Sequence, residues 1–286
     1  MFGLFESDGF LGIDCGAEYK LAEAENNSFV TKRTKELTKD IIKNFNSKKT
    51  ATAVSSKQVE IRFVDVADNL SAEEIENMIE LEFTRDDLVI QYEVVDFFEQ
   101  KYAIAFAVEE NLVQDKFDNL KEIGLKPRVI ETEFHANLRY LVQQNSGLNE
   151  TVSLVDVGRE KTDLIVIKEQ ELIFARNFAF GGDSITERLT KLNEISLAEA
   201  EEYKMAGLDQ EELKIVLEEL RSQIYNSIDY LQSKYREQVS KIFVTGGSSK
   251  LKGIKEYLEN QIGLPVEKID DADLSVAKGL SLREEK

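Results

Sequence analysis

The chain has 286 residues and a formal net charge of -19, with 42% hydrophobic and 32% charged residues. This length exceeds the ~100–200 residues usual for one domain, so we expect two lobes, and the composition is that of a globular protein with a sizeable core. The acidic charge argues against a general nucleic-acid binder, because affinity for phosphate backbones comes from clustered Lys and Arg, but it suits a basic peptide partner.

The cysteine content and the lack of long apolar stretches indicate where in the cell the protein is expected. Cys15 is the only cysteine, which excludes a disulfide or a cysteine-based metal site within the chain and favours a reducing compartment. The opening residues MFGLFESDGF lack the basic segment and apolar length of a signal peptide. No stretch approaches the ~18 apolar residues of a transmembrane helix, so we expect any membrane attachment to depend on another protein.

A hairpin and a helix open the predicted structure. Residues 10–24 have the pattern of two strands joined by a tight turn at Gly16. Residues 31–45 are predicted to be helical, because apolar side chains recur on one helical face at Leu37, Ile41, Ile42 and Phe45. The sheet around this helix is expected to be small, which leaves the size of the first lobe open.

Residues 51–131 have the predicted order β-α-β-β-α-β, a unit able to stand as its own subdomain. The first of its helices begins at a capping box of Ser71 and Glu74, and two adjacent strands follow at 88–98 and 102–108. Its second helix stops at Gly124, with Pro127 just beyond. Alternation predicts the preceding strand at Val59, Ile61 and Phe63.

The second half begins with three strands, a Gly-Gly-Asp turn at 181–183 and a helix. The strands are predicted at 152–157, 163–167 and 171–178. From 211 to 238, apolar residues recur every three or four positions, which favours a packed domain helix over a coiled coil. The strand 241–245 then runs into Gly246-Gly247-Ser248-Ser249 and a helix from Leu251, which Gly263-Leu264-Pro265 ends.

Two strands end in Asp-x-Gly, at Asp14 and Gly16 and again at Asp156 and Gly158. Glycine lets backbone N–H groups approach a phosphate closely, and an aspartate can hold a hydrated divalent cation. Each piece alone is also ordinary turn chemistry. In the order hairpin, hairpin, Gly-Gly-Asp, Gly-Gly-Ser-Ser, they favour a nucleotide bound between two copies of a duplicated lobe.

With these motifs the chain resembles the actin-like ATPases, and among them the PilM family of type IV pilus assembly. The two phosphate loops of that superfamily are matched by residues 12–16 and 156–162, and its Gly-Gly turn by residues 181–186. Its Ala-Glu-x-x-Lys segment is similar to residues 200–204, and its adenosine motif to residues 245–248. Residues 227–230 and GLKPRVIETEF at 124–134 are similar to PilM in particular. The extra subdomain lies where PilM and the division protein FtsA carry theirs.

The resemblance implies an α/β actin-like fold with two lobes around a nucleotide cleft, and ATP and Mg as cofactors. Asp14 and Asp156 would hold Mg through water. The expected nucleotide-binding residues are Asp14, Gly16, Lys20, Asp156, Gly158, Thr162, Gly181, Gly182, Asp183, Glu201, Lys204, Gly246, Gly247 and Ser248. The implied organisation is a first-lobe core of 1–50 and 128–150 with 273–286, an extra subdomain of 51–127, and a second lobe of 151–272 with a helical subdomain at about 184–235.

The first phosphate loop departs from the family, because Ala17, Glu18 and Tyr19 replace its hydroxyl residues and Glu18 can repel a phosphate. Each lost hydrogen bond to a charged group costs ~1.5–3 kcal/mol, so we expect nucleotide affinity to fall tenfold to several hundredfold. Binding can survive this loss through the backbone N–H groups, whereas hydrolysis is expected to be weak or absent. Glu133 matches the position that orients the attacking water in relatives, and it can equally cap the following helix. His135 is expected to pack near that helix rather than bind a metal.

The implied function is that of a cytoplasmic adaptor at the inner membrane, which holds the N-terminal tail of a PilN-like membrane protein. Other inner-membrane pilus assembly proteins and a second copy of the chain are further expected partners; nucleic acid and direct membrane insertion are not expected. An active ATPase or sugar kinase and an FtsA-like division filament are the alternatives. Against the last, LSVAKGLSLREEK at 274–286 has no basic amphipathic face. The predicted partner groove comprises Val59, Ile61, Phe63, Ile75 and Ile79.

Overall fold

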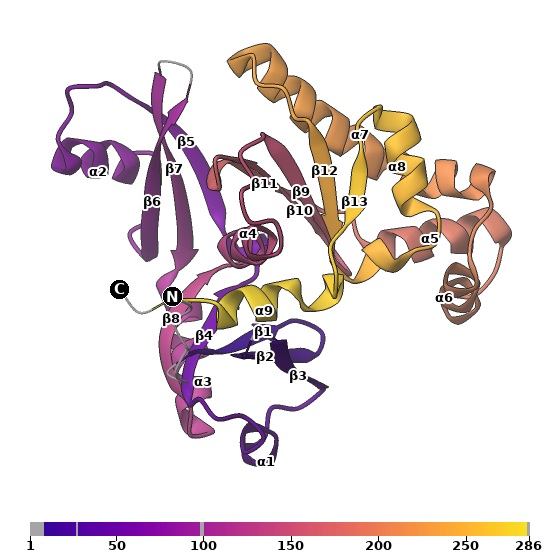
Figure 1. Cartoon of the computed structure of the whole chain (residues 1–286), viewed down its shortest axis with the longest axis horizontal. Coiled ribbons are helices and arrows are strands. Elements are labelled where there is room, and N and C mark those ends of the chain that lie inside the picture. Colours follow the sequence, from indigo (N-terminus) through magenta and orange to yellow (C-terminus); the bar gives the residue numbers. More distant parts are fainter. Residues whose placement is uncertain (1–8, 27, 98–99, 285–286) are drawn as a thin grey trace. The chain divides into compact units, whose positions relative to one another are not determined.

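The computed structural model describes residues 9–26, 28–97 and 100–284, which form two compact units (Figure 1). Unit 1 combines residues 1–146 and 274–286, whereas unit 2 is the continuous segment 147–273. Residues 1–8 of the opening segment, which was predicted not to be a signal peptide, lie outside the described part. Residues 98–99, where the strand predicted to end at 98 meets the next one, lie outside it as well.

The core of unit 1 is a five-stranded sheet in the order β3-β2-β1-β4-β8. Strand β1 pairs antiparallel with β2 and parallel with β4, and β4 pairs parallel with β8. The strands are β1 Leu11–Cys15, β2 Tyr19–Glu25, β3 Ser28–Thr34, β4 Lys49–Val54 and β8 Lys126–Thr132. The helices that pack on this sheet are α1 Lys39–Ile42, α3 Glu110–Glu122, α4 Glu133–Gln144 and α9 Ser275–Ser281.

Alternation along β1 divides these helices between the two faces of the sheet. Leu11 and Ile13 point to a cluster that includes Phe45, after α1, and Leu120 of α3. On the other face, Gly12 lies beneath α9: a Cβ on Gly12 would overlap the carbonyl oxygen of Ala277 and lie 2.7 Å from the backbone nitrogen of Ser281. The glycine that opens the first motif therefore serves helix packing.

The predicted helix 31–45 is wrong for its first part. Residues 28–34 form β3, which pairs with β2 along its whole length, and helix α1 covers only Lys39–Ile42. The β-branched residues of β3 suit an extended strand, and pairing with β2 decides the matter. The apolar face was nonetheless identified, since Leu37, Ile41, Ile42 and Phe45 all contribute to the core.

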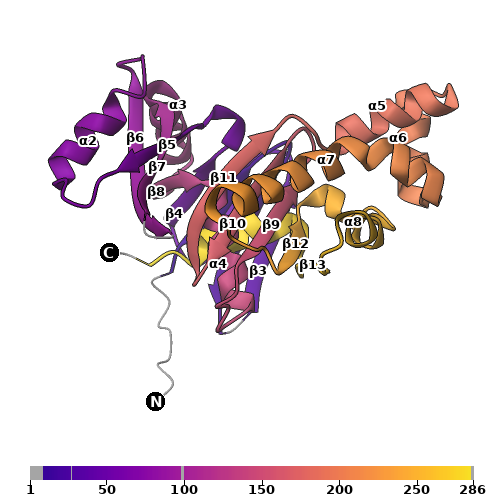
Figure 2. The same cartoon turned by 90° about the horizontal axis from the view of Figure 1, so that it is seen from above.

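A separate three-stranded sheet, in the order β5-β7-β6, completes unit 1. Helix α2 packs on one face of it (Figure 2). Its elements are β5 Glu60–Val66, α2 Ala72–Glu80, β6 Leu88–Phe97 and β7 Gln100–Glu109, with the short 3-10 turn η1 Ser56–Gln58 before them. The capping box of Ser71 and Glu74 is confirmed. Of the two predicted outer strands of the β-α-β-β-α-β unit, the first is β5 of this sheet, but the last is β8, which pairs with β4 in the five-stranded sheet instead. Strand β4 was not predicted.

Unit 2 repeats the strand pattern of the first sheet, in the order β11-β10-β9-β12-β13. Three antiparallel strands are again followed by two parallel ones. The strands are β9 Val152–Val157, β10 Thr162–Lys168, β11 Glu171–Phe178, β12 Lys241–Thr245 and β13 Val266–Lys268. The helices are α5 Gly182–Asn193, α6 Leu197–Ala206, α7 Gln210–Tyr235 and α8 Ile254–Ile262, with 3-10 turns η2 Gly247–Lys250 and η3 Ala272–Leu274.

Helix α7 packs within unit 2, as the interpretation of a domain helix predicted. Its apolar positions at 213, 217, 220, 224, 228, 231 and 235 are all buried. Arg176 of β11 donates a hydrogen bond to Gln223 at 3.0 Å, which ties the sheet to the helix. Helix α8 begins at Ile254 rather than Leu251 and ends at Gly263 in the left-handed conformation. Among the described residues, no helix is long and apolar enough to cross a membrane.

Candidate functional site

The predicted nucleotide-binding residues are divided between the units. Asp14, Gly16 and Lys20 belong to unit 1, at the turn between β1 and β2, and the other eleven belong to unit 2. Asp14 and Lys20 are direct cross-strand partners, and Lys20 Nζ lies 3.2 Å from Asp14 Oδ2. A hydrated cation at Asp14 would therefore compete with an ammonium group of the same protein for a largely buried carboxylate.

The turn itself is closed by a hydrogen bond from the Gly16 backbone nitrogen to the Glu18 carbonyl oxygen at 3.3 Å. A Cβ on Gly16 would lie 3.8 Å from that oxygen, so the fold of the turn does not itself require glycine. Next to it, Cys15 Sγ lies 3.6 Å from Thr52 Oγ1. Burial raises the pKa of the Cys15 thiol, which keeps it protonated and unreactive.

Glu133 makes a contact with η1 that the sequence did not predict. Its carboxylate accepts a hydrogen bond from the Ser56 backbone nitrogen at 2.9 Å, which ties the start of α4 to η1. The N-cap of α4 is Thr132, whose hydroxyl accepts from the His135 backbone nitrogen. Thr132 was not identified from the sequence, although a Thr followed by Glu before an apolar run is an ordinary N-cap signal. The catalytic role of Glu133 stays a prediction.

His135 packs on its helix, as expected. Its Nδ1 lies 2.6 Å from Thr132 Oγ1 and its Nε2 lies 3.0 Å from Glu93 Oε1. The ring also meets Phe106 edge-on, with 5.1 Å between centroids. Within the described ranges 9–26, 28–97 and 100–284, no group of three His, Cys, Asp or Glu side chains is placed to hold a metal.

In unit 2 three glycine-containing segments that are distant in sequence meet. The Gly182 backbone nitrogen donates to the Gly158 carbonyl oxygen at 3.0 Å, and Ser248 Oγ donates to the same oxygen at 2.7 Å. The Asp183 backbone nitrogen donates to the Arg159 carbonyl at 2.8 Å. The second Asp-x-Gly loop is thus held by the Gly-Gly-Asp turn and by the Gly-Gly-Ser-Ser turn.

Gly246 is where this cluster most needs glycine. Its φ is +85°, and a Cβ there would overlap Asp156 Oδ1 and lie 2.5 Å from the carbonyl oxygen of Val157. Its neighbour Gly247 has open space instead, with no heavy atom within 4 Å of its Cβ position. The turn therefore presents bare backbone beside the Asp156 carboxylate, an arrangement that suits close approach of a phosphate or a sugar.

Lys204 and Glu201 join the cluster from α6. Lys204 Nζ donates to the Gly182 carbonyl at 3.1 Å and to Thr186 Oγ1 at 2.7 Å, and it lies 2.7 Å from Glu201 Oε2. Burial would raise the pKa of Glu201, but hydrogen bonds from Lys204 and Thr186 outweigh it and hold that pKa below its ordinary value. Both side chains predicted to contact ribose and base are therefore ordered next to the glycine turn.

Two of the predicted nucleotide-binding side chains, Thr162 and Asp183, already bond to other groups around the second Asp-x-Gly loop. The buried Thr162 hydroxyl donates to the Phe180 carbonyl at 2.7 Å, so its proton is used inside the unit. Asp183 pairs with Arg159 at 3.1 Å on the surface of the loop. The Thr162 hydroxyl and the Asp183 carboxylate are therefore both engaged within unit 2.

The predicted partner groove is only partly accessible. Ile75 and Ile79 of α2 point into the three-stranded sheet, at 9% and 1% exposure, and Val59 is buried as well. Ile61 and Phe63 lie on the opposite face of β5, an edge strand, and Phe63 is 37% exposed with its ring beside Tyr102. The apolar surface available to a partner is therefore carried by Ile61 and Phe63.

The chain is similar to known proteins over nearly its whole length. The family described as "Type IV pilus assembly protein PilM" matches residues 12–281. A solved PilM–PilN type IV pilus biogenesis complex contains a chain that is 21% identical, covers 97% of this chain and 99% of its own length, and has a TM-score of 0.81.

More distant structures share the architecture. MreB5 of Spiroplasma citri bound to AMPPNP is 15% identical over 96% of this chain and 95% of its own, with a TM-score of 0.53. A protein with an actin-like ATPase fold from Bacteroides thetaiotaomicron is 12% identical over 99% and 100%, with a TM-score of 0.52. The mixed α/β fold of this chain is therefore the actin-like ATPase fold.

Proposed function

Because the chain belongs to the PilM family of type IV pilus assembly proteins, we propose that it is an adaptor that binds the N-terminal cytoplasmic tail of a PilN-like inner-membrane protein. The tail would hold the adaptor peripherally at the inner membrane, where other pilus assembly proteins can reach it. The observation that carries this proposal is the similarity over 97% of the chain to a protein whose solved complex contains PilN.

The charge of the chain and an edge strand of unit 1 support the proposal. A net charge of -19 attracts a basic peptide and speeds its encounter with the protein. Strand β5 is an edge strand of its sheet, and an extended tail can pair with such an edge while an apolar anchor contacts Phe63. Backbone pairing would give affinity, and the anchor would give specificity.

A binding titration tests this function. A synthetic peptide of the cognate tail, an Asn-Leu-Leu-Pro-type segment with basic residues, is labelled and titrated with the full chain in a fluorescence anisotropy assay. Phe63→Ala should weaken binding about tenfold, the usual effect of truncating an apolar anchor. Val89→Ala is the matched control, because Val89 lies on the opposite edge strand at 39% exposure. No binding of the wild type at high micromolar peptide would reject the proposal.

We further propose that unit 2 binds ATP with Mg, and that hydrolysis is weak or absent. The Gly246 turn beside Asp156 and the ordered Lys204 support binding, whereas the Asp14–Lys20 pair and the missing hydroxyls at 17–19 oppose turnover. ATP when bound would supply a hydrated Mg ion, which Asp156 of unit 2 would hold. The chain's own contribution is a bare backbone turn for the nucleotide and a fixed lysine.

Calorimetric titration with Mg-ATP tests the nucleotide site. The wild type should release or absorb heat with a one-site isotherm, and the variant Asp156→Ala should bind far more weakly. If the wild type gives no heat of binding but still binds the tail peptide, the proposed nucleotide site is rejected. The protein would then be an adaptor with an actin-like fold that binds no nucleotide. Phosphate release well above that of Asp156→Ala would contradict weak or absent hydrolysis.

A further inference from the structure

Helix α6 carries large apolar side chains that the fold leaves in contact with solvent. Among the described residues, Met205 at 78% and Leu197 at 60% are two of the three most exposed large apolar side chains. The buried residue of this helix is Ala200, the smallest apolar side chain it has. A surface helix normally turns its large apolar side chains toward the core, and α6 does the opposite.

The exposed apolar side chains lie on one side of the helix. Leu197 and Met205 are eight residues apart, a spacing that belongs to one helical stripe and corresponds to about 12 Å along the axis. Ala198 and Glu202 are exposed beside them. These four residues are here called the α6 face. In both ribbon views α6 lies at the end of unit 2 that is farthest from the sheet of that unit (Figures 1 and 2).

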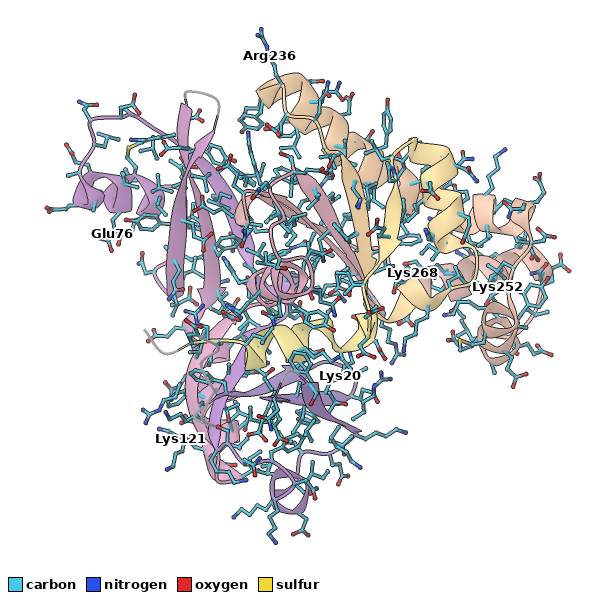
Figure 3. All side chains as sticks on the ribbon, viewed as in Figure 1. Lys20, Glu76, Lys121, Arg236, Lys252 and Lys268 are labelled. Carbon is cyan, nitrogen blue, oxygen red and sulfur yellow. The ribbon has the colours of Figure 1, made fainter. Side chains whose placement is uncertain are left out.

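The helix that carries this face is well anchored. It begins at a capping box whose N-cap is Ser196. On its inner side, Lys204 Nζ donates to the Gly182 carbonyl oxygen at 3.1 Å. At its end lies Gly207, where a Cβ would be 3.3 Å from Cδ of Lys252, which is labelled in Figure 3. The exposure of the α6 face is therefore a property of a fixed helix and is not caused by fraying at its ends.

The surroundings of the α6 face are strongly acidic. Residues 194–212 include seven acidic residues and one basic residue, Lys204, which is turned inward. The wider helical segment 187–219 has ten acidic and four basic residues. Within the described part of the chain, the side chains of Glu194, Glu202 and Glu211 make no hydrogen bond or ion pair. Negative charge that the protein does not neutralise itself therefore surrounds the exposed apolar side chains.

We propose that the α6 face docks a basic amphipathic helix of a partner protein. The apolar side of that helix contacts Leu197 and Met205, and its Lys and Arg side chains meet the surrounding carboxylates. Methionine is flexible and polarisable, which suits a surface that receives a partner helix. The α6 face belongs to unit 2 and shares no residue with the tail-binding edge proposed in unit 1, so this docking does not depend on that function.

The local structure favours a helical occupant over an extended one. Residues 182–235 form α5, α6, α7 and the turns between them, so an extended segment finds no strand edge there with which to pair. Two apolar side chains two turns apart instead form part of a ridge, against which the side chains of a second helix can pack.

The charge favours a basic occupant over the other candidates. A second copy of the chain would bring the same carboxylates against each other, and like charges across an interface oppose association. An anionic membrane surface and a nucleic acid are repelled by the same carboxylates. A basic helix both covers the apolar side chains and compensates the charge.

Fluorescence anisotropy with the full chain tests the proposal. The probe is a labelled helical peptide of leucine and lysine, with its leucines along one face. The variant Leu197→Ala, Met205→Ala should bind it at least about tenfold more weakly than the wild type, the usual effect of truncating apolar anchors. Added salt and Glu202→Lys should each weaken binding as well, because both reduce the attraction between the charges.

The matched control is Leu81→Ala, Val94→Ala, which truncates two exposed apolar side chains of unit 1, at 84% and 42% exposure. This variant should bind the probe as the wild type does. An equal loss in the control, or equal binding of a peptide with glutamate in place of lysine, would overturn the proposal. So would equal binding of a scrambled peptide whose leucines lie all around the helix, or no binding at high micromolar protein.

Two further measurements exclude other occupants. Sedimentation velocity of the protein alone should show no association through α6; a dimer that Leu197→Ala, Met205→Ala abolishes would overturn the proposal in favour of a second copy. Phe63→Ala should bind the probe normally, and the α6 variant should bind the tail peptide normally. Loss of either would place the two ligands on one site and refute a separate docking face. A wild type that binds the probe but no tail peptide would reject the adaptor function and leave the α6 face supported.

Discussion

Substitution of Gly12 by alanine tests whether the first glycine of the phosphate motif serves the fold. The new methyl group would overlap the Ala277 carbonyl oxygen, and its other neighbour, the Ser281 nitrogen at 2.7 Å, is also backbone, so no side-chain rotation relieves the clash. Overpacking alone costs ~1–3 kcal/mol. If α9 moves away instead, it uncovers Leu280, which is fully buried, at a further cost of ~2–5 kcal/mol. We expect a loss of about 3 kcal/mol or more.

Thermal unfolding followed by circular dichroism measures this loss. At roughly 2–4 °C per kcal/mol for a unit of this size, Gly12→Ala should lower the melting temperature by about 6 °C or more. Gly16→Ala is the control from the same motif, because its nearest neighbour would be 3.8 Å away, and it should stay within ~0.5 kcal/mol of the wild type. Equal melting temperatures for Gly12→Ala and the wild type would refute the packing role of Gly12.

Three further expectations concern unit 2. Gly247→Ala should leave the unfolding curve unchanged, because its Cβ meets open space, and should weaken Mg-ATP binding in calorimetry; unchanged affinity would remove Gly247 from the site. Glu201 has a lowered pKa, so its stabilising effect should be complete above 4.5 and disappear as pH falls through the lowered pKa. Wild type and Glu201→Gln should then differ in urea unfolding at neutral pH and converge in acid; a constant difference would contradict this. Asp209→Ala removes the cap that accepts the N–H groups of residues 211 and 212, and should cost ~1 kcal/mol in the same assay; no change would show that the cap is dispensable.

Local patterns predicted most of the elements, and long-range pairing decided where they were wrong. The capping box at Ser71 and the buried face of α7 depend on residues a few positions apart, so the sequence contains them. Strand β3 depends on pairing with β2, and no helical periodicity reports that. The same holds for β4 and β8, whose place in the five-stranded sheet depends on contacts with β1 and with each other.

In the candidate site, too, local motifs could be predicted and long-range contacts could not. The order of glycine motifs predicted which segments would gather, and those of unit 2 do gather around Gly158. The partners of individual side chains could not be predicted, because they depend on backbone atoms brought in by folding. The Thr162 hydroxyl is taken by Phe180 and the Glu133 carboxylate by Ser56, neither of which belongs to any motif.

The split of unit 1 between residues 1–146 and 274–286 has a consequence for synthesis on the ribosome. All of unit 2 is translated before α9, whose residues 275–281 are all buried in unit 1 and cover Gly12 of β1. The second unit can fold while the nascent first unit still exposes an apolar sheet face, which is a substrate for chaperones and for aggregation. Translation arrest just before Leu274 should therefore yield a chain with one folded unit and one protease-sensitive unit.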